Sequence, residues 1–450
     1  MAFIQAQLTA PTGLEVRVVE FHLPGGLRSI MSAKPKYDEE PYFWPDPPYY
    51  ERYIYGSGDY GKTWTEVTNT KTHIPFTITP LDSGIDAVLD AIYCGGSKVI
   101  GRALDTTPTT KFLRLESNDA GVNWSMKDES ALLTISGTLN QYLDNSQTDM
   151  CYAGDGEIYT LRPKAESANG NMIQANVYKS TDYGDVVWTK EDVINGWNCR
   201  GLYYIGKWEE PGYRQGRKRF LCVADFDQDG KFDSSGQDSA QYTGVMRSDN
   251  NGKEWFLQQM LPPNLYNNPH GQSSNGWQSK SKFAYLGDGV VLLLSDTSGD
   301  ELWFSDAAVY KSTDYGSTWA EIARIPKSPY LKSYLGDPVP DSQATDQHSL
   351  GIWYLGKQRD ERYHVSSYRA YKTVVYAWVA TSFSLTLGNP NHNLRDQWIS
   401  EDGGTTWKNT TTIPSMIDTT TPATTLPAQV WWQDAGFYVG DNGAIPGLYD

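Results

Sequence analysis

The stretch STDYGSTW, residues 312–319, decides the fold, because five similar stretches accompany it along the chain. Each has a serine, then aspartate or asparagine two residues later, then glycine after two more, and ends in tryptophan. We call each of these stretches a box. Boxes recur about every sixty residues, with a longer last interval, and such a period is typical of propellers and solenoids. The six boxes are SGDYGKTW at 57–64, SNDAGVNW at 117–124, STDYGDVVW at 180–188, SDNNGKEW at 248–255, STDYGSTW at 312–319 and SEDGGTTW at 400–407.

The box residues predict a turn between two strands and not a catalytic site. An aspartate in a turn accepts hydrogen bonds from backbone N–H groups of the same turn. Glycine permits a backbone conformation that other residues avoid, and the tryptophan begins the next strand and packs its large ring into the sheet. Short apolar strands flank each box. In the fifth box, for example, VYKS stands before Thr313 and TWAEI stands after it. We therefore assign the box residues to structure and place no ligand on them.

The boxes resemble the Asp-box, or BNR, repeats of sialidases, sortilin-type receptors and related propellers. In that family the box joins the third and fourth strands of a blade. The resemblance spans residues 57–407. It implies an all-β, six-bladed β-propeller with one Asp box per blade, occupying residues 1–450 as a single domain. The long interval after the fifth box leaves room for a seventh blade without a box.

The two ends of the chain are predicted to share one blade. After the last box, QVWWQDAGFYVGD and AIPGLYD would supply its first two strands. The segment YERYIYGS and the first box would supply the other two. Such sharing closes the ring and removes exposed sheet edges.

Composition excludes several functions. The net charge of −16 repels phosphate backbones, so we expect no nucleic-acid partner. No run of eighteen apolar residues exists, so we expect no membrane insertion. The start, MAFIQAQLTAPTG, lacks the basic segment followed by an apolar segment that is typical of a signal peptide. We therefore expect a virion or tail location, or an extracellular one if a signal has been removed.

The four cysteines lie in apolar runs and are expected to be buried thiols: Cys94, Cys151, Cys199 and Cys222.

The segment DFDQDGKFD, residues 225–233, predicts a Ca²⁺ site. Its alternating carboxylates converge on one hard cation, and Gly230 permits the tight turn. The segment departs from an EF-hand because Gly236 stands where a bidentate glutamate belongs. It resembles the calcium hairpins of integrin α-chain propellers, between two strands. The expected ligands are Asp225, Asp227, Asp229, the carbonyl of Lys231, and Asp233.

A ligand is expected on the face opposite the boxes, where long loops carry aromatic and amide residues. The Pro- and aromatic-rich loop 34–50 is one of these loops. Aromatic rings beside amide and charged groups suit sugar rings, which present C–H patches and hydroxyls. The alternative is that these rings fasten the loops to the body of the protein. The candidate ligand-binding residues are Trp44, Tyr266, His270, Trp277, Tyr330, Tyr334, His348, His392 and Arg395.

The arginine triad of sialidases cannot be assembled from motifs. The one Arg-Ile-Pro element, Arg324 to Pro326, follows the fifth box and is expected to end an outer strand. Before the first box the sole candidate is Arg28. Among 54 acidic residues, sequence neither locates nor excludes the carboxylate pair of other glycoside hydrolases.

The leading interpretation is a non-catalytic propeller that binds a glycan or a host-surface protein. The composition, with few helix-forming stretches and many Tyr, Asn, Gln and Thr, is similar to that of bacteriophage tail or virion proteins, so other virion proteins are further candidate partners. The first alternative is a glycoside hydrolase, sialidase-like or other, acting on surface polysaccharide. The second is a structural virion protein without a ligand.

Overall fold

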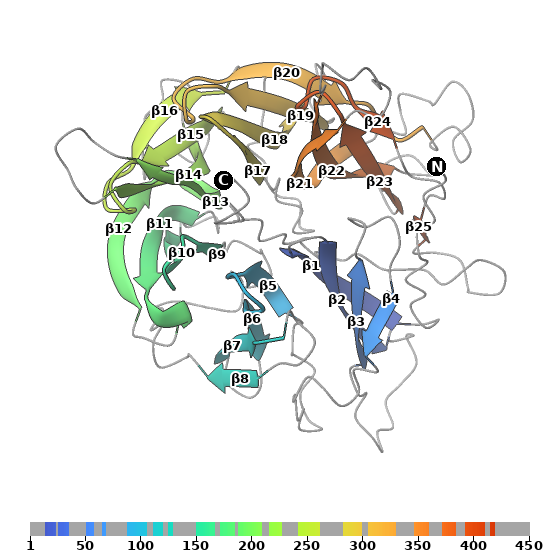
Figure 1. Ribbon diagram of the computed structural model, residues 1–450, viewed down its shortest axis with the longest axis horizontal. Coiled ribbons are helices and arrows are strands. Elements are labelled where there is room, and N and C mark those ends of the chain that lie inside the picture. The colour runs from blue at the N-terminus through green and yellow to red at the C-terminus, as the bar shows by residue number, and fades with distance from the viewer. Residues whose placement is uncertain are drawn as a thin grey trace. The chain divides into compact units, whose positions relative to one another are not determined.

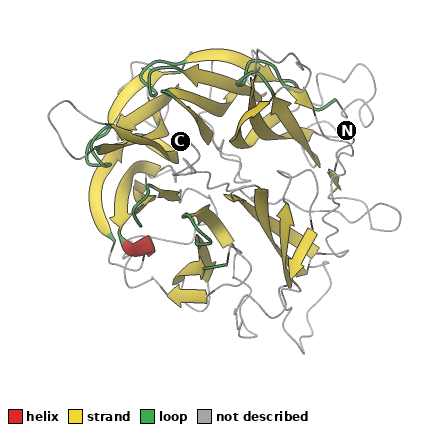
Figure 2. Ribbon diagram, viewed as in Figure 1, coloured by secondary structure: helices red, strands yellow, loops and turns green. Residues whose placement is uncertain are grey.

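The structure is a computed structural model of the 450-residue chain. It describes residues 14–23, 26–35, 51–57, 65–68, 88–105, 111–119, 125–128, 150–166, 172–184, 188–208, 216–226, 242–261, 282–298, 305–329, 346–359, 371–383, 392–409 and 415–418. These residues are almost entirely β-strands, and their one helical element is the single 3-10 turn Asp182–Gly184 (Figure 2). No described helix has the length and hydropathy needed to cross a membrane.

The chain divides into two compact units, and the first in chain order spans Ile4–Ile194 with Ile417–Asp450. Its described strands form three antiparallel four-stranded sheets (Figure 1). The first contains β1 (Leu14–Leu23), β2 (Gly26–Pro35), β3 (Glu51–Ser57) and β4 (Thr65–Thr68). The second contains β5 (Val88–Tyr93), β6 (Val99–Asp105), β7 (Lys111–Ser117) and β8 (Ser125–Asp128). The third contains β9 (Met150–Tyr152), β10 (Ile158–Glu166), β11 (Met172–Ser180) and β12 (Thr189–Asn195).

The other unit spans Asn195–Met416 together with Met1–Phe3 and holds three further sheets among its described residues. The first contains β13 (Trp197–Trp208), β14 (Arg217–Phe226), β15 (Tyr242–Ser248) and β16 (Phe256–Met260). The second contains β17 (Lys282–Gly287), β18 (Val290–Ser298), β19 (Ser305–Ser312) and β20 (Ala320–Ile325). The third contains β21 (Asp346–Arg359), β22 (Tyr371–Phe383), β23 (His392–Ser400) and β24 (Lys408–Asn409), with β25 (Ser415–Asp418) paired to β23.

Each sheet is a meander, so that neighbouring strands are consecutive in the chain. Within each unit the first strands of successive sheets lie beside one another: β1 contacts β5 and β5 contacts β9, while β13 contacts β17 and β17 contacts β21. Four-stranded meanders stacked in this order are the blades of a β-propeller. The described part of the chain has five regular four-stranded blades where six were expected, because the sheet of β21–β24 carries the additional strand β25.

The predicted sharing of one blade between the chain ends is wrong for the first sheet. The hairpin of β1 and β2 pairs along its whole length, from Leu14 opposite Pro35 to Leu23 opposite Gly26. Strand β2 then pairs with β3, so β1 and β2 occupy the places assigned to the C-terminal strands. All four strands of this sheet therefore come from residues 14–68, and residues 419–450 lie outside the described part.

The core lies between the sheets. One apolar cluster joins β13–β16 to β17–β20 and contains Leu221, Phe283 and Trp319. A second joins β17–β20 to β21–β24 and contains Leu292, Val379 and Trp398. In the other unit, Ile92, Ile158 and Trp188 belong to a third cluster. The four cysteines are buried and free, as expected.

The box turns connect the third and fourth strands of each sheet, as predicted. In the fifth box, Ser317 N and Thr318 N donate hydrogen bonds to Asp314 Oδ1, at 3.0 and 2.9 Å. Ser312 Oγ donates to the same oxygen at 2.8 Å and accepts from Gly316 N at 2.8 Å. The sixth box repeats this pattern with Asp402, and the fourth box has Asn250 in the same role. The aspartate thus orders its own turn.

The box glycine allows the turn to touch the preceding sheet. Gly316 has φ +82°, and a Cβ there would lie 2.7 Å from Leu221 Cδ2. Gly404 has φ +95°, and a Cβ there would lie 2.8 Å from Leu292 Cδ1. Leu221 and Leu292 occupy equivalent positions, because each follows the residue that pairs with its own box serine. A side chain at these glycines would therefore be excluded both by backbone conformation and by space.

Trp319→Ala should lower the free energy of unfolding by about 3–5 kcal/mol, as deletion of large buried aromatic side chains does. The ring is 5% exposed, and its Nε1 donates to Gly316 O at 2.9 Å. Chemical denaturation measures the change. The matched control is Phe256→Ala, because Phe256 is 59% exposed and its replacement should cost about 0.5 kcal/mol or less. Equal losses in the two variants would contradict the assignment of Trp319 to the core.

Asp314→Asn should reduce the acid sensitivity of the fold. Burial opposes the ionisation of Asp314, but hydrogen bonds from Thr318, Ser312 and Ser317 outweigh it and hold the pKa of this carboxyl below its ordinary value of 3.8. A pKa that is lower in the folded state means that the ionised group stabilises the fold above about pH 4. This contribution is lost as the pH falls through the folded-state pKa.

Asparagine keeps the acceptor oxygen without the titration, as Asn250 does in its own box. Denaturation curves between pH 5 and pH 3 should therefore fall less steeply for the variant than for the wild type. Asp288→Asn, at an exposed hairpin position, serves as the control and should keep the wild-type slope. An unchanged slope in Asp314→Asn would show that this turn does not contribute to acid unfolding.

Candidate functional site

The candidate site is the end of the sheet β21–β22–β23 that lies away from its box. In the antiparallel register, His348 is opposite Ala380, and Ala380 is opposite Arg395. His392 pairs with Phe383 at the start of β23. Because neighbouring strands are about 4.8 Å apart, the backbones of His348 and Arg395 are about 10 Å apart. Three of the predicted ligand-binding residues are therefore brought together at one end of one sheet.

Two further polar residues share this end of the sheet. Asp346 begins β21 and is opposite Ser382, and Ser382 is opposite Asn393. The row that contains Asp346, Ser382 and Asn393 lies two residues beyond the row that contains His348 and Arg395. Hydrogen-bond donors and acceptors of both signs of charge thus come from adjacent strands.

The other predicted ligand-binding residues lie outside the described residues. They are Trp44, Tyr266, His270, Trp277, Tyr330 and Tyr334. The loop 34–50 is described only at its first two residues, as the end of β2.

Asp396 is a buried carboxylate beside this site that sequence reasoning missed. It is 1% exposed and is opposite Val379, a member of the apolar cluster between two sheets. A carboxylate in such surroundings is costly unless neighbouring groups stabilise it. The available signal was an acidic residue in the alternating series Leu394, Asp396 and Trp398, where an apolar residue would be expected.

Four of the five predicted calcium ligands fall on the connection between β14 and β15. Phe226 pairs with Tyr242, so residues 227–241 join these strands at the end away from the box, and they lie outside the described residues. Only Asp225 is described. It lies within β14 with 5% exposure, and its Oδ1 accepts a hydrogen bond from Thr243 Oγ1 at 3.2 Å. The arrangement of Asp227, Asp229, Lys231 and Asp233 stays a prediction.

The Arg-Ile-Pro element ends an outer strand, as expected. Arg324 lies in β20, the last strand of its sheet, and its Nε is 2.8 Å from Glu321 Oε1 on the same strand. Ile325 is 1% exposed and belongs to the core. Arg28 lies in β2 opposite Phe21 and Gly56.

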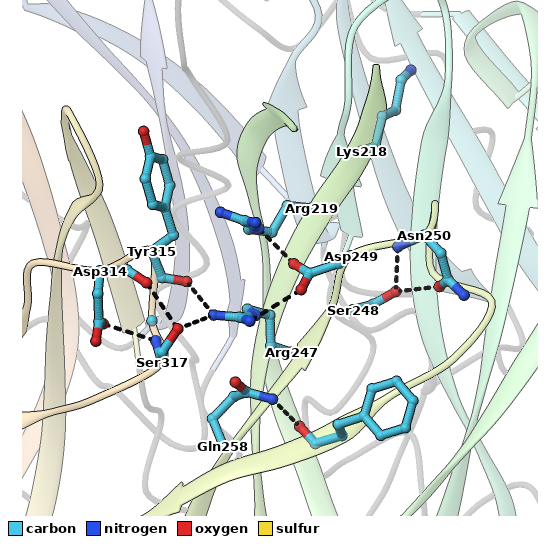
Figure 3. Close-up of polar contacts among 12 residues, drawn as sticks. Lys218, Arg219, Arg247, Ser248, Asp249, Asn250, Gln258, Asp314, Tyr315 and Ser317 are labelled. Carbon is cyan, nitrogen blue, oxygen red and sulfur yellow. Dashed lines mark hydrogen bonds and ion pairs between the residues drawn. The ribbon is translucent and has the colours of Figure 1, made fainter. Parts of the chain in front are cut away.

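A polar cluster at the box end joins two sheets and was also missed by sequence reasoning (Figure 3). Asp249 accepts from Arg219 Nε at 2.5 Å and from Arg247 Nη2 at 3.0 Å. Arg247 also donates to Ser317 Oγ and to the carbonyl oxygen of Tyr315, both in the next box. Both arginines are largely buried and engaged by protein groups, so this cluster connects sheets and does not form an open ligand site.

No protein-family model matches the chain, and no curated protein matches its sequence. Solved structures are similar to it at low identity. The fucose-specific lectin from Aleuria aurantia is 11% identical with a TM-score of 0.42, over 92% of this chain and 99% of the lectin. The α-L-arabinanase from Penicillium chrysogenum is 13% identical with a TM-score of 0.42, over 88% of this chain and 98% of the enzyme.

A mutant of the sialidase NanB from Streptococcus pneumoniae is 11% identical with a TM-score of 0.29. That similarity covers 90% of this chain and 62% of the sialidase. Similarities of this extent do not identify a ligand for this chain.

Proposed function

We propose that this chain is a non-catalytic recognition propeller that binds a glycan or a host-surface protein. The observation that carries the proposal is the strand register that gathers His348, His392 and Arg395 at one sheet end. Imidazole and guanidinium groups donate hydrogen bonds to hydroxyls and carboxylates, and guanidinium does so in a planar fork. The neighbouring Asp346 and Asn393 add acceptors, which suits ligands that present several hydroxyl groups.

The two ends of each blade differ in their polar groups and connections, and this difference supports a ligand site at the end away from the boxes. At the box end, polar groups of the turns bond to one another and to the adjacent sheet. At the opposite end, long connections such as 326–345 and 384–391 precede β21 or join β22 to β23. Long loops on a rigid scaffold are where recognition residues concentrate. We infer that the ligand meets the end away from the boxes.

The proposal includes the finer architecture. We infer that each blade carries one Asp box, and that the chain acts as a tail or receptor-binding component of a virus, with other virion proteins as neighbours. The support for the repeat is the recurrence of the box, and the support for the viral role is composition alone.

Arg395→Ala should weaken ligand binding by about tenfold to hundredfold, because a hydrogen bond to a charged group contributes about 1.5–3 kcal/mol. The full chain would be screened against arrayed glycans and host-surface proteins, and the variant tested by surface plasmon resonance on the best ligand. Lys408→Ala is the matched control, since Lys408 is an exposed cation at the box end of the same sheet. Its affinity should equal that of the wild type.

Unchanged affinity in Arg395→Ala, with the wild-type melting temperature, would contradict the proposed location. Chromatography of the glycan after long incubation with the wild type tests catalysis. Release of shortened products would show a glycoside hydrolase and overturn the non-catalytic assignment. Binding to no glycan and no protein would favour the purely structural alternative.

We also propose that residues 225–233 bind Ca²⁺. The support is the spacing of Asp227, Asp229 and Asp233 around Gly230, directly after a strand that ends at Phe226. Oxygen-only ligation favours a hard cation, and Ca²⁺ tolerates irregular geometry better than Mg²⁺. Asp225 already accepts a hydrogen bond from Thr243 of the adjacent strand β15, so we expect the three loop aspartates to carry most of the ligation.

Removal of Ca²⁺ by EDTA should lower the melting temperature, because an ion that binds only the folded loop stabilises it by mass action. The double variant with Asp227→Asn and Asp229→Asn should no longer respond to EDTA. Asp155→Asn, in an exposed hairpin of the other unit, should respond as the wild type does. Absence of heat on titration with millimolar CaCl₂ would refute the calcium site.

A further inference from the structure

Two cation–tyrosine contacts join adjacent sheets at the box end, one in each compact unit. Lys98 Nζ lies 4.5 Å from the ring centroid of Tyr183, and Arg219 Cζ lies 4.8 Å from that of Tyr315. In each contact the cation comes from one sheet and the tyrosine from the box of the next sheet along the chain. We call each contact a latch.

The two latches are copies of one arrangement. Lys98 precedes Val99, which pairs with the box serine Ser117. Arg219 precedes Phe220, which pairs with the box serine Ser248. The cations therefore occupy the same position in their sheets.

The tyrosines are equivalent as well. Tyr183 and Tyr315 each follow the box aspartate and have φ values of 57° and 59°. Their N–H groups donate to Gly156 O at 2.8 Å and to Gly289 O at 2.9 Å. This backbone bond holds each box against the first hairpin of its own sheet and presents the ring to the preceding sheet.

Acidic groups of the earlier sheet hold each cation in place. Lys98 Nζ is 2.6 Å from Glu116 Oε1, and Arg219 pairs with Asp249 (Figure 3). Burial opposes the ionisation of Glu116, but its hydrogen bonds with Lys98 and Arg114 hold the pKa of this carboxyl below its usual value. The cation is thus oriented before it meets the ring, which reduces the entropy lost on contact.

The tyrosine rings are seated against their own sheets. Tyr152 stacks on Tyr183 with centroids 5.9 Å apart, and Tyr285 lies 6.5 Å from Tyr315. A Cβ at Gly289 would lie 2.8 Å from the Tyr315 ring, whereas a Cβ at Gly287 would meet nothing within 4 Å. Each ring therefore contacts both its own hairpin and the cation of the neighbouring sheet, and Tyr315 is 40% exposed.

The junction between β17–β20 and β21–β24 has a different construction. Val290 stands at the cation position there, and Gly403 stands at the tyrosine position of the next box. The described side chains at this junction form an apolar cluster, with Leu286 3.9 Å from the Cβ position of Gly403. Of the two described junctions in the unit that contains Asn195–Met416, one is therefore latched and one is not.

We propose that the latches couple sheets in pairs, β5–β8 with β9–β12 and β13–β16 with β17–β20, so that the box of the second sheet opens only when the latch breaks. Cation–π contacts that are partly desolvated contribute measurably to stability, and these cations carry a second tie to an acid. Local opening in native proteins occurs in cooperative units of this kind. Two sheets joined by a latch therefore open together as one cooperative unit.

Hydrogen–deuterium exchange measured by mass spectrometry on the full chain tests this coupling. Arg219→Met should speed exchange in residues 312–319 by about two- to thirtyfold, which is the range expected for loss of a cation–π contact. Exchange in residues 400–407 should stay at the wild-type rate, because that box lacks a latch. Tyr315→Phe keeps the ring and should preserve protection, while Tyr315→Leu should match Arg219→Met.

Two further comparisons separate the latch from general destabilisation. The double variant with Arg219→Met and Tyr315→Leu should exchange no faster than the faster single variant, because both changes remove one contact. Gly289→Ala should accelerate exchange more than Gly287→Ala, although both glycines have positive φ, since only Gly289 seats the ring. Additive effects in the double variant, or equal acceleration of both boxes by Arg219→Met, would overturn the proposal.

Discussion

The close approach of the fifth and sixth box turns to the preceding sheet is the constraint on which the rest of the described fold depends. Gly316 and Gly404 place their backbones where a Cβ would lie within 3 Å of a leucine of the preceding sheet. Sheets stacked face to face normally leave room for side chains from both faces. At the box end the backbone itself fills this space, so the turn must be rigid and must lack a side chain at one position.

The other box residues make that approach possible. The aspartate collects backbone N–H groups into a compact turn, and the serine hydroxyl bonds to both the aspartate and the glycine N–H. The tryptophan indole then returns to the glycine carbonyl. Because the polar groups of the turn are satisfied internally, the turn can pack against apolar side chains without leaving buried groups unpaired.

The consequence is a division between the two ends of each sheet. The box end is occupied by turn, latch and inter-sheet bonds, such as the two between Gln259 and the backbone of Trp319. The opposite end combines strand-borne polar residues with longer connections, and it is where the register gathers His348, His392 and Arg395.

Sequence reasoning succeeded where the information is local and failed where it is not. The turn chemistry of the boxes and the end of β20 after Ile325 depend on a few adjacent residues, and both were correctly predicted. The hairpin of β1 and β2 was missed, although the sequence Pro-Gly-Gly at 24–26, which is typical of turns, separates two runs suited to strands. This hairpin fills the places in the sheet that were assigned from the sequence to the C-terminal strands.

By itself, the sequence determined that the chain is an array of β-meanders with a rigid turn after each third strand, because that turn follows from residue types at fixed spacing. Tertiary structure alone decided which strands share a sheet and which cation meets which tyrosine, because these pairings join residues far apart in the chain. Lys98 and Arg219 look like ordinary surface charges in the sequence. Only the strand register, which is set by long-range pairing, places them over Tyr183 and Tyr315.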